Sequence, residues 1–315
     1  MNIAGNKIEP GESKQLSFVI ARLPSHTDIE LVIHVHRSKK PGPVVLFSGG
    51  LHGDEINGIE IVRRILDQGI GEPVTGTVIS IPILNVYGFI NFSRYVPDGK
   101  DINRSFPGST TGSLAARVAH FIDHNILPLI DFGLDFHTGG DNRTNFPQIR
   151  CDYKDKMSIE LAKSTNAPFL VNSPLIPRSL RSAAFKRGKR ILVYEGGESM
   201  RMDELAISEG IECAKNLLEH LGMSSTTENE VKDSSSIVIS DSKWIRSKYS
   251  GIFHSEVSSG QIMEKGEIIG FITDPFGAFR KKIKMPVEGY IIGLNNTPIV
   301  HQGDALVHYG TEKLH

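Results

Sequence analysis

Short apolar runs that end in glycine turns constrain the fold of this chain more than any other feature. Val44–Phe47 and Ile191–Tyr194 are unbroken apolar runs, and a pair of glycines follows each within three residues. Such runs are typical of strands buried on both faces of a sheet. Between them, apolar residues of Ile56–Leu66 recur every three or four positions, which predicts an amphipathic helix that Gly69 ends. This alternation predicts an α/β fold, a mixed sheet with flanking helices.

The same patterns place further elements along the first two thirds of the chain. Apolar residues predict strands at Thr77–Ile81 and Asp131–Phe136. Three- and four-residue periodicity predicts helices at Ala115–Leu127 and Asp203–Leu221. The strands therefore alternate with helices, as crossover connections in a sheet require.

The composition changes after residue 222. Residues 223–236 are polar, rich in serine and threonine, and without periodicity, which predicts a linker. Residues 237–315 contain only short β-like runs and glycine turns, which predicts a small all-β barrel or sandwich. We therefore expect a first domain at residues 1–222 and a second at residues 237–315.

Glycine positions in the second predicted domain suggest two related halves. Gly251 and Gly266 are followed at nearly equal offsets by Gly289 and Gly303. This stretch resembles the biotinyl/lipoyl-type half-barrel, in which such turns join short strands. Lys284 does not lie where that family has its modified lysine, because a proline and a glycine follow too soon. We expect an unmodified barrel.

Overall composition excludes several classes of partner. The 315 residues carry a formal net charge of -1, which provides no bulk field toward nucleic acid or an anionic membrane. No apolar run approaches the roughly 18 residues that a membrane span needs. Cys151 and Cys213 lack metal-site or disulfide spacing, and the first residues lack a signal pattern, so we expect buried thiols and a cytoplasmic protein.

A histidine and a glutamate lie at the junction between the first buried strand and the following helix. His52 and Glu55 are three residues apart, so both side chains can turn toward one point, as a zinc site with open coordination requires. Such a pair is also typical of a capping carboxylate beside an exposed histidine. Further ligands decide between these interpretations.

A second strand also ends in a histidine. His137 follows Asp131–Phe136 and precedes two glycines. Because ligands collect beyond the carboxyl ends of strands in α/β sheets, we expect His137 to meet His52 there as a third ligand. Asp135 shares a strand face with His137, which predicts that it orients an imidazole; an ordinary polar contact is the alternative.

A carboxylate stands at the end of a third strand. Glu195 follows four apolar residues and precedes two glycines, and beside a dication it could take a proton from water. Its alternative is an ion-paired residue at a helix entry, an interpretation that suits Glu198 better because Glu198 lies further into the loop. Glu195 is therefore the predicted general base.

The chain resembles the succinylglutamate desuccinylase/aspartoacylase family, a branch of the zinc carboxypeptidase-like fold, over about residues 40–220. The motifs that carry the resemblance are, in chain order, Gly49–Glu55, Asp101–Gly108, Asp135–His137 and Tyr194–Gly197. The resemblance implies hydrolysis of an N-acyl amino acid, with one zinc per chain on the positions matching His52, Glu55 and His137. It also implies that Glu195 is the general base.

Four further residues complete the predicted site. Arg94 precedes the second motif much as a transition-state arginine does in that family, so we expect it to stabilise the oxyanion. Asn103 and Arg104 resemble the residues that bind a substrate carboxylate, which suits an amide beside a guanidinium fork. Arg181 is similar to the family's second substrate arginine, although its spacing to Glu195 is longer. A solvated surface charge is the alternative for each arginine.

We therefore expect a zinc-dependent deacylase that needs no cofactor besides zinc and acts on a small N-acyl amino acid. A metallocarboxypeptidase acting on short peptides would use the same metal, base and carboxylate clamp. A non-catalytic zinc-binding or carrier protein is a third possibility, although a structural metal site has no need of Glu195. The sequence leaves the acyl group and the oligomeric state open, and a homo-oligomer is compatible with it.

Overall fold

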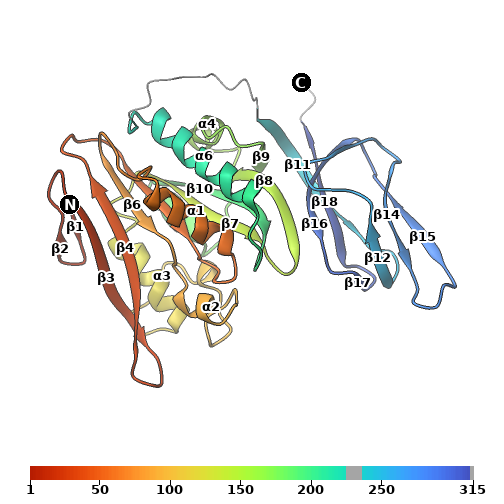
Figure 1. The fold of residues 1–315 in the computed structure, drawn as a ribbon, viewed down its shortest axis with the longest axis horizontal. Helices are drawn as coiled ribbons and strands as arrows, with labels where there is room; N and C mark the ends of the chain where they lie inside the picture. Colours follow the sequence, from red (N-terminus) through yellow and green to blue (C-terminus); the bar gives the residue numbers. More distant parts are fainter. Residues whose placement is uncertain (225–235, 313–315) are drawn as a thin grey trace.

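The computed structural model describes residues 1–224 and 236–312. The linker predicted at residues 223–236 lies almost entirely outside these described residues. Helices and a sheet make up the first part of the chain, and the part after residue 236 is built of strands (Figure 1). Within the described residues, no helix is long and apolar enough to cross a membrane.

One continuous sheet joins both parts of the chain. Among the described residues, neighbouring strands in this sheet follow the order β13 (Ile262–Met263), β16 (Gly289–Asn295), β18 (Ala305–Glu312), β11 (Ile237–Arg246), β9 (Phe169–Asn172), β8 (Arg143–Cys151), β10 (Arg190–Glu198), β7 (Phe132–Gly139), β5 (Val44–Gly49), β6 (Thr77–Ile81), β4 (Asp28–Arg37) and β3 (Ser13–Arg22). Strands β6, β5, β7 and β10 run parallel to one another. Their carboxyl ends therefore meet at one edge of the sheet, as the sequence predicts.

Helices cover both faces of the parallel strands. Their bounds are α1 Ile56–Asp67, α2 Val86–Ile90, α3 Leu114–Asn125, α4 Lys156–Ser164, α5 Leu180–Lys186 and α6 Glu204–His220, with a 3₁₀ turn η1 at Ile102–Arg104. Helices α1, α4 and α6 contribute to the core that contains Val45 and Phe47. Helices α3 and α5 contribute to the core that contains Leu46, on the opposite face because side chains alternate along a strand. The predicted mixed α/β architecture is confirmed.

The predicted elements agree closely with those of the structure. Helix α1 begins one residue after Glu55 and buries Ile61, Val62 and Ile65. Helix α6 has Asp203 as its N-cap, whose side chain accepts a hydrogen bond from the Ala206 amide. For α6 the local signals were sufficient because the periodicity and the capping residue coincide, whereas α1 was recognised from its periodicity alone.

The strands after residue 236 close a barrel with two strands of the first part. Strand β11 pairs in parallel with β9, and β16 pairs with β8, where Gly293 lies opposite Asn145. With the β9–β8, β11–β18 and β16–β18 pairings, these five strands form a closed ring. The predicted β structure is confirmed for the described residues 237–312, and the ring places β11 beside β9 and β16 beside β8.

Two smaller sheets complete the described structure. Beside the barrel, a four-stranded sheet has the order β15 (Arg280–Lys284), β14 (Ile268–Thr273), β12 (Gly251–Ser255) and β17 (Ile299–Val300). The hairpin of β1 (Asn2–Ile3) and β2 (Asn6–Lys7) lies at the N-terminus. Cys151 and Cys213 are buried and unpaired in the α4–α6 core, as expected.

Candidate metal centre and active site

The loop between β5 and α1 carries two of the predicted ligands, and its path depends on a glycine. A Cβ atom on Gly53 would lie 2.0 Å from the carbonyl carbon of Gly88 in helix α2. Only glycine permits this close approach of two backbones. The loop therefore passes directly against α2, with His52 and Glu55 on either side of the contact.

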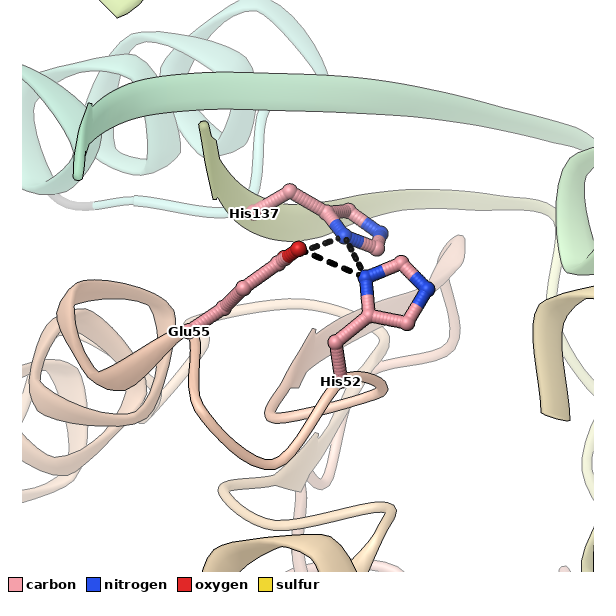
Figure 2. Close-up of side chains that lie close together, drawn as sticks. All are labelled: His52, Glu55 and His137. Atoms are coloured by element: carbon pink, nitrogen blue, oxygen red, sulfur yellow. Dashed lines mark hydrogen bonds and ion pairs between the residues drawn. The ribbon is translucent and has the colours of Figure 1, made fainter. Parts of the chain in front are cut away.

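The three predicted metal ligands converge on one buried point (Figure 2). The Nδ1 atoms of His52 and His137 each lie 2.7 Å from an oxygen of Glu55, and they are 3.2 Å from each other. The donor atoms all lie within 4.8 Å of one another, and the three residues are almost fully buried. Two imidazoles and one carboxylate form the ligand set of many catalytic zinc sites.

The outward ring nitrogens of both histidines face aspartates, and that of His137 is hydrogen-bonded. The Nε2 atom of His137 lies 2.7 Å from Asp135, which also accepts a 2.7 Å hydrogen bond from the Ser48 hydroxyl. Because a carboxylate only accepts, Nε2 carries a proton, which leaves Nδ1 as the nitrogen that can bind a metal once its own proton is lost. The Nε2 atom of His52 faces Asp101 at 3.4 Å. Such outer partners are typical of metal-binding histidines, so these residues fit a zinc ion.

The histidines and carboxylates of this cluster shift one another's pKa values toward the charged forms. Burial alone would lower the pKa of His52 and His137, but the carboxylates of Glu55, Asp101 and Asp135 outweigh burial and raise both. Burial would raise the pKa of Glu55, but the two imidazoles hold it well below its usual range. Without a metal, the histidines therefore hold protons against the carboxylates, and a metal ion must displace them.

Arg94 lies at the edge of the metal cluster. Its guanidinium donates from Nε and Nη2 to the same oxygen of Asp101, at 3.2 and 2.8 Å. Its Nη1 lies 3.2 Å from His52 Nδ1 and 3.5 Å from Glu55. A fixed positive charge therefore stands beside the point where the ligand atoms meet.

Glu195 lies in the strand next to His137. The two residues are register partners in the parallel strands β10 and β7, so their side chains share a face of the sheet. One Glu195 oxygen accepts a 2.7 Å hydrogen bond from the Asn145 amide, and the other lies 3.0 Å from Arg150 Nη1. Glu198 instead accepts hydrogen bonds from side chains of the β8 edge and the barrel.

The predicted substrate residues differ in how many hydrogen bonds they already make within the protein. The Asn103 side-chain oxygen accepts a 2.9 Å hydrogen bond from the Leu180 amide, and exposed Arg104 donates to the Asn103 carbonyl. Arg181 is buried and donates to the backbone carbonyls of Arg150, Ser173 and Pro174 at 3.1, 3.0 and 2.7 Å. Fewer donors of Arg181 therefore remain for a ligand than the sequence suggested.

A single cavity of about 320 Å³ contains the predicted site. The predicted residues that line it are His52, Glu55, Arg94, Asn103, Arg104, Asp135, His137, Arg181 and Glu195. Among the other lining residues, sequence reasoning missed several with long polar or aromatic side chains, namely Arg143, Asn145, Arg150, Trp244 and His308. No motif marks these five. Pairing of β8 with β10 brings Asn145 and Arg150 to the cavity, and the barrel pairings bring Trp244 and His308. The one available signal is that Trp244 is the only tryptophan of the chain.

Known proteins match both the sequence and the fold. A family model described as the succinylglutamate desuccinylase/aspartoacylase catalytic domain matches residues 41–221. The N-alpha-acetyl-L-2,4-diaminobutyric acid deacetylase of Halomonas elongata is 30% identical over 247 residues, which cover 74% of this chain and 71% of the relative.

Solved structures of similar proteins extend over nearly the whole chain. A succinylglutamate desuccinylase/aspartoacylase from Rhodobacter sphaeroides has a TM-score of 0.83 at 24% identity and covers 99% of both chains. The product-bound ectoine utilization protein of Ruegeria pomeroyi has a TM-score of 0.83 at 21% identity and covers 95% of both. With the family model and the 30% identical relative, the chain belongs to the succinylglutamate desuccinylase/aspartoacylase family.

Proposed function

We propose that this protein is a zinc-dependent hydrolase that cleaves the amide bond of an N-acyl amino acid. One zinc ion is held by His52, Glu55 and His137. The observation that carries the proposal is the convergence of three buried donor atoms within 4.8 Å, with aspartates behind both imidazoles. The same ligand set supports a relationship to the zinc carboxypeptidase-like fold. The 30% identical relative, a deacetylase of an N-acetyl amino acid, supports the reaction class.

Glu195 is the proposed general base. A bound zinc ion would act as a Lewis acid that polarises the scissile carbonyl and makes water more acidic. Glu195 accepts the proton of the attacking water and later returns it to the leaving amine. Asn145 and Arg150 hold one carboxylate oxygen each, which fixes the side chain on the same face as His137.

Arg94 is the proposed oxyanion stabiliser. Its Nη1 already lies within 3.5 Å of ligand atoms of His52 and Glu55, so its charge is next to the carbonyl that reacts. Asp101 fixes the guanidinium from behind, which limits its reorganisation during the reaction. A preorganised cation stabilises developing negative charge more than a mobile one does.

Asn103 and Arg104 are the proposed binding residues for the α-carboxylate. Both line the cavity, and a guanidinium with an amide matches a planar anion. Arg181 is retained as a proposed substrate residue, and its contacts with backbone carbonyls support an additional role in shaping the cavity wall. A cavity of about 320 Å³ suits a small substrate better than a peptide. The two buried thiols support a reducing compartment, and we propose the cytoplasm.

A hydrolysis screen tests this proposal. Zinc-loaded protein is incubated with N-acetyl, N-succinyl and other N-acyl amino acids, and with short peptides, while release of the free amine is measured. The proposal expects turnover of at least one N-acyl amino acid and loss of that turnover in Glu195→Gln. Cleavage of peptides alone would identify a carboxypeptidase. Zinc binding without any turnover would identify a binding protein.

A further inference from the structure

Three side chains stack on the barrel side of the cavity. The rings of Trp244 in β11 and His308 in β18 are 4.8 Å apart and nearly parallel, at 10°. The guanidinium carbon of Arg143 in β8 lies 5.8 Å from the centre of the Trp244 ring. All three residues line the cavity, and Trp244 and His308 are register partners in paired strands. We name these three residues the barrel stack.

Two buried polar atoms of the barrel stack have no hydrogen-bond partner among the described residues. They are Nε of Arg143 and Nδ1 of His308. A guanidinium Nε–H can only donate, and a neutral imidazole can donate from Nδ1. Buried polar atoms are almost always paired, so two orphans in one cavity wall indicate a ligand that supplies acceptors.

The charges around the barrel stack favour an anion. Burial, and then the charge of Arg150, lower the pKa of His308 to about 3, so this imidazole is neutral near neutral pH. The nearest carboxylate to Arg143 is that of Asp141, which lies 3.5 Å away and is 75% exposed, so solvent screens the pair. A cationic group would meet the Arg143 guanidinium here, while the charge of Arg150 is paired with Glu195 at 3.0 Å. A carboxylate would accept from both orphan donors.

The barrel stack lies close to the reacting centre and apart from the proposed α-carboxylate residues. A Cβ atom on Gly140 would lie 3.9 Å from a Glu55 oxygen, and the Gly140 carbonyl accepts from the Arg143 amide. Arg104 belongs instead to η1, which Asn103 links to the start of α5. Two sets of anion-binding groups therefore reach one cavity from different elements.

We propose that Arg143, Trp244 and His308 form a subsite that binds a second carboxylate of the substrate and thereby selects among N-acyl amino acids. The Nε–H of Arg143 and the Nδ1–H of His308 donate to this carboxylate, and Trp244 holds both side chains in position by stacking. The inference rests on the proposed deacylase function. The second carboxylate comes either from the acyl group or from the amino-acid side chain.

Matched pairs of substrates test the subsite. N-succinyl-L-alanine is compared with N-succinamoyl-L-alanine, and N-acetyl-L-glutamate with N-acetyl-L-glutamine; each pair differs only in one terminal charge. The wild-type kcat/KM is expected to favour the charged member of one pair, which tells whether the acyl group or the side chain carries the carboxylate. Arg143→Gln is expected to reduce this preference about 10- to 100-fold, as loss of a charged hydrogen bond implies.

A second variant and a control separate recognition from folding. His308→Phe keeps an aromatic ring against Trp244 but removes the nitrogen, so the preference should fall without loss of the stack. Arg246→Gln is the control, because Arg246 is exposed on the same strand as Trp244 and does not line the cavity. The control should keep the wild-type preference.

The subsite and the deacylase function can fail separately. Calorimetric binding of the same four compounds to Glu195→Gln protein gives the comparison between charged and neutral ligands without turnover. Failure to hydrolyse any compound would contradict the proposed function. Equal binding of charged and neutral partners, or a preference that survives in both Arg143→Gln and His308→Phe, would overturn the subsite.

Discussion

Replacing Asp135 by asparagine isolates the contribution of the aspartate behind His137. Asp135 is 1% exposed and accepts two hydrogen bonds of 2.7 Å, from His137 Nε2 and from the Ser48 hydroxyl. Asparagine keeps the shape but replaces a charged acceptor with a neutral one. Charge-assisted hydrogen bonds contribute about 1 to 1.5 kcal/mol more than neutral ones. Zinc affinity is therefore expected to fall about 10-fold, within the range found for outer partners of metal ligands.

The effect of Asp135→Asn has a defined pH dependence. Asp135 is the strongest of the charges that raise the pKa of His137, so its removal lowers that pKa and reduces proton competition for Nδ1. At low pH the proton on wild-type His137 competes with zinc, so the raised pKa weakens zinc binding by the wild type more than by the variant. The affinity ratio between wild type and variant should therefore be larger at pH 8 than at pH 6.

Competition with a chromogenic chelator at both pH values measures this effect. Asp131→Asn is the matched control, because Asp131 directly precedes the same strand, is half exposed and contacts the Val44 amide and Lys189 rather than a metal ligand. The control should bind zinc as the wild type does. A folded Asp135→Asn protein with wild-type affinity at pH 8 would refute the reasoning.

Three further substitutions give independent tests. Glu195→Gln keeps the shape but removes the proton acceptor, so kcat should fall at least roughly 100-fold while inductively coupled plasma analysis still finds zinc. Arg104→Ala should cost an N-acyl amino acid on the order of 2 to 5 kcal/mol in kcat/KM and barely affect the corresponding amide; equal losses would make Arg104 structural. Gly53→Ala places a Cβ atom 2.0 Å from the Gly88 carbonyl carbon, so calorimetry should find a lower Tm and weaker zinc binding than in Gly71→Ala, where the added Cβ atom meets its nearest neighbour at 3.6 Å.

The sequence was sufficient for the parallel strands and for the residues at their ends. Val44–Phe47 and Ile191–Tyr194 are apolar enough to be recognised singly, and parallel strands bring their carboxyl ends to one edge whatever their order. His52, His137 and Glu195 follow such ends directly. Their convergence therefore required only local pattern and one topological rule.

The residues that hold Glu195 could not be predicted in the same way. Strand β8, which carries Asn145 and Arg150, has a polar first half and contains Pro147, a residue that argues against a central strand. Pro147 lies between the residue of β8 that pairs with β16, Asn145, and the first that pairs with β9, Gln148, and opposite a register shift in β10. No periodicity therefore marked this segment as part of the sheet.

The barrel side of the cavity depends on contacts between distant parts of the chain. Trp244 and His308 reach the cavity because β11 pairs with β9 and β16 pairs with β8. These pairings join residues that are far apart in sequence, and local patterns contain no information about them. For the same reason, the carbonyls that engage Arg181 could not be foreseen.

Metal content per chain tests the central claim most directly. Protein purified with added zinc and dialysed is analysed by inductively coupled plasma mass spectrometry, together with His52→Ala and His137→Ala. Three protein ligands that meet at one point predict about one zinc per chain in the wild type and loss of most of it in both variants. Full retention of zinc in both variants would contradict the assignment of the site.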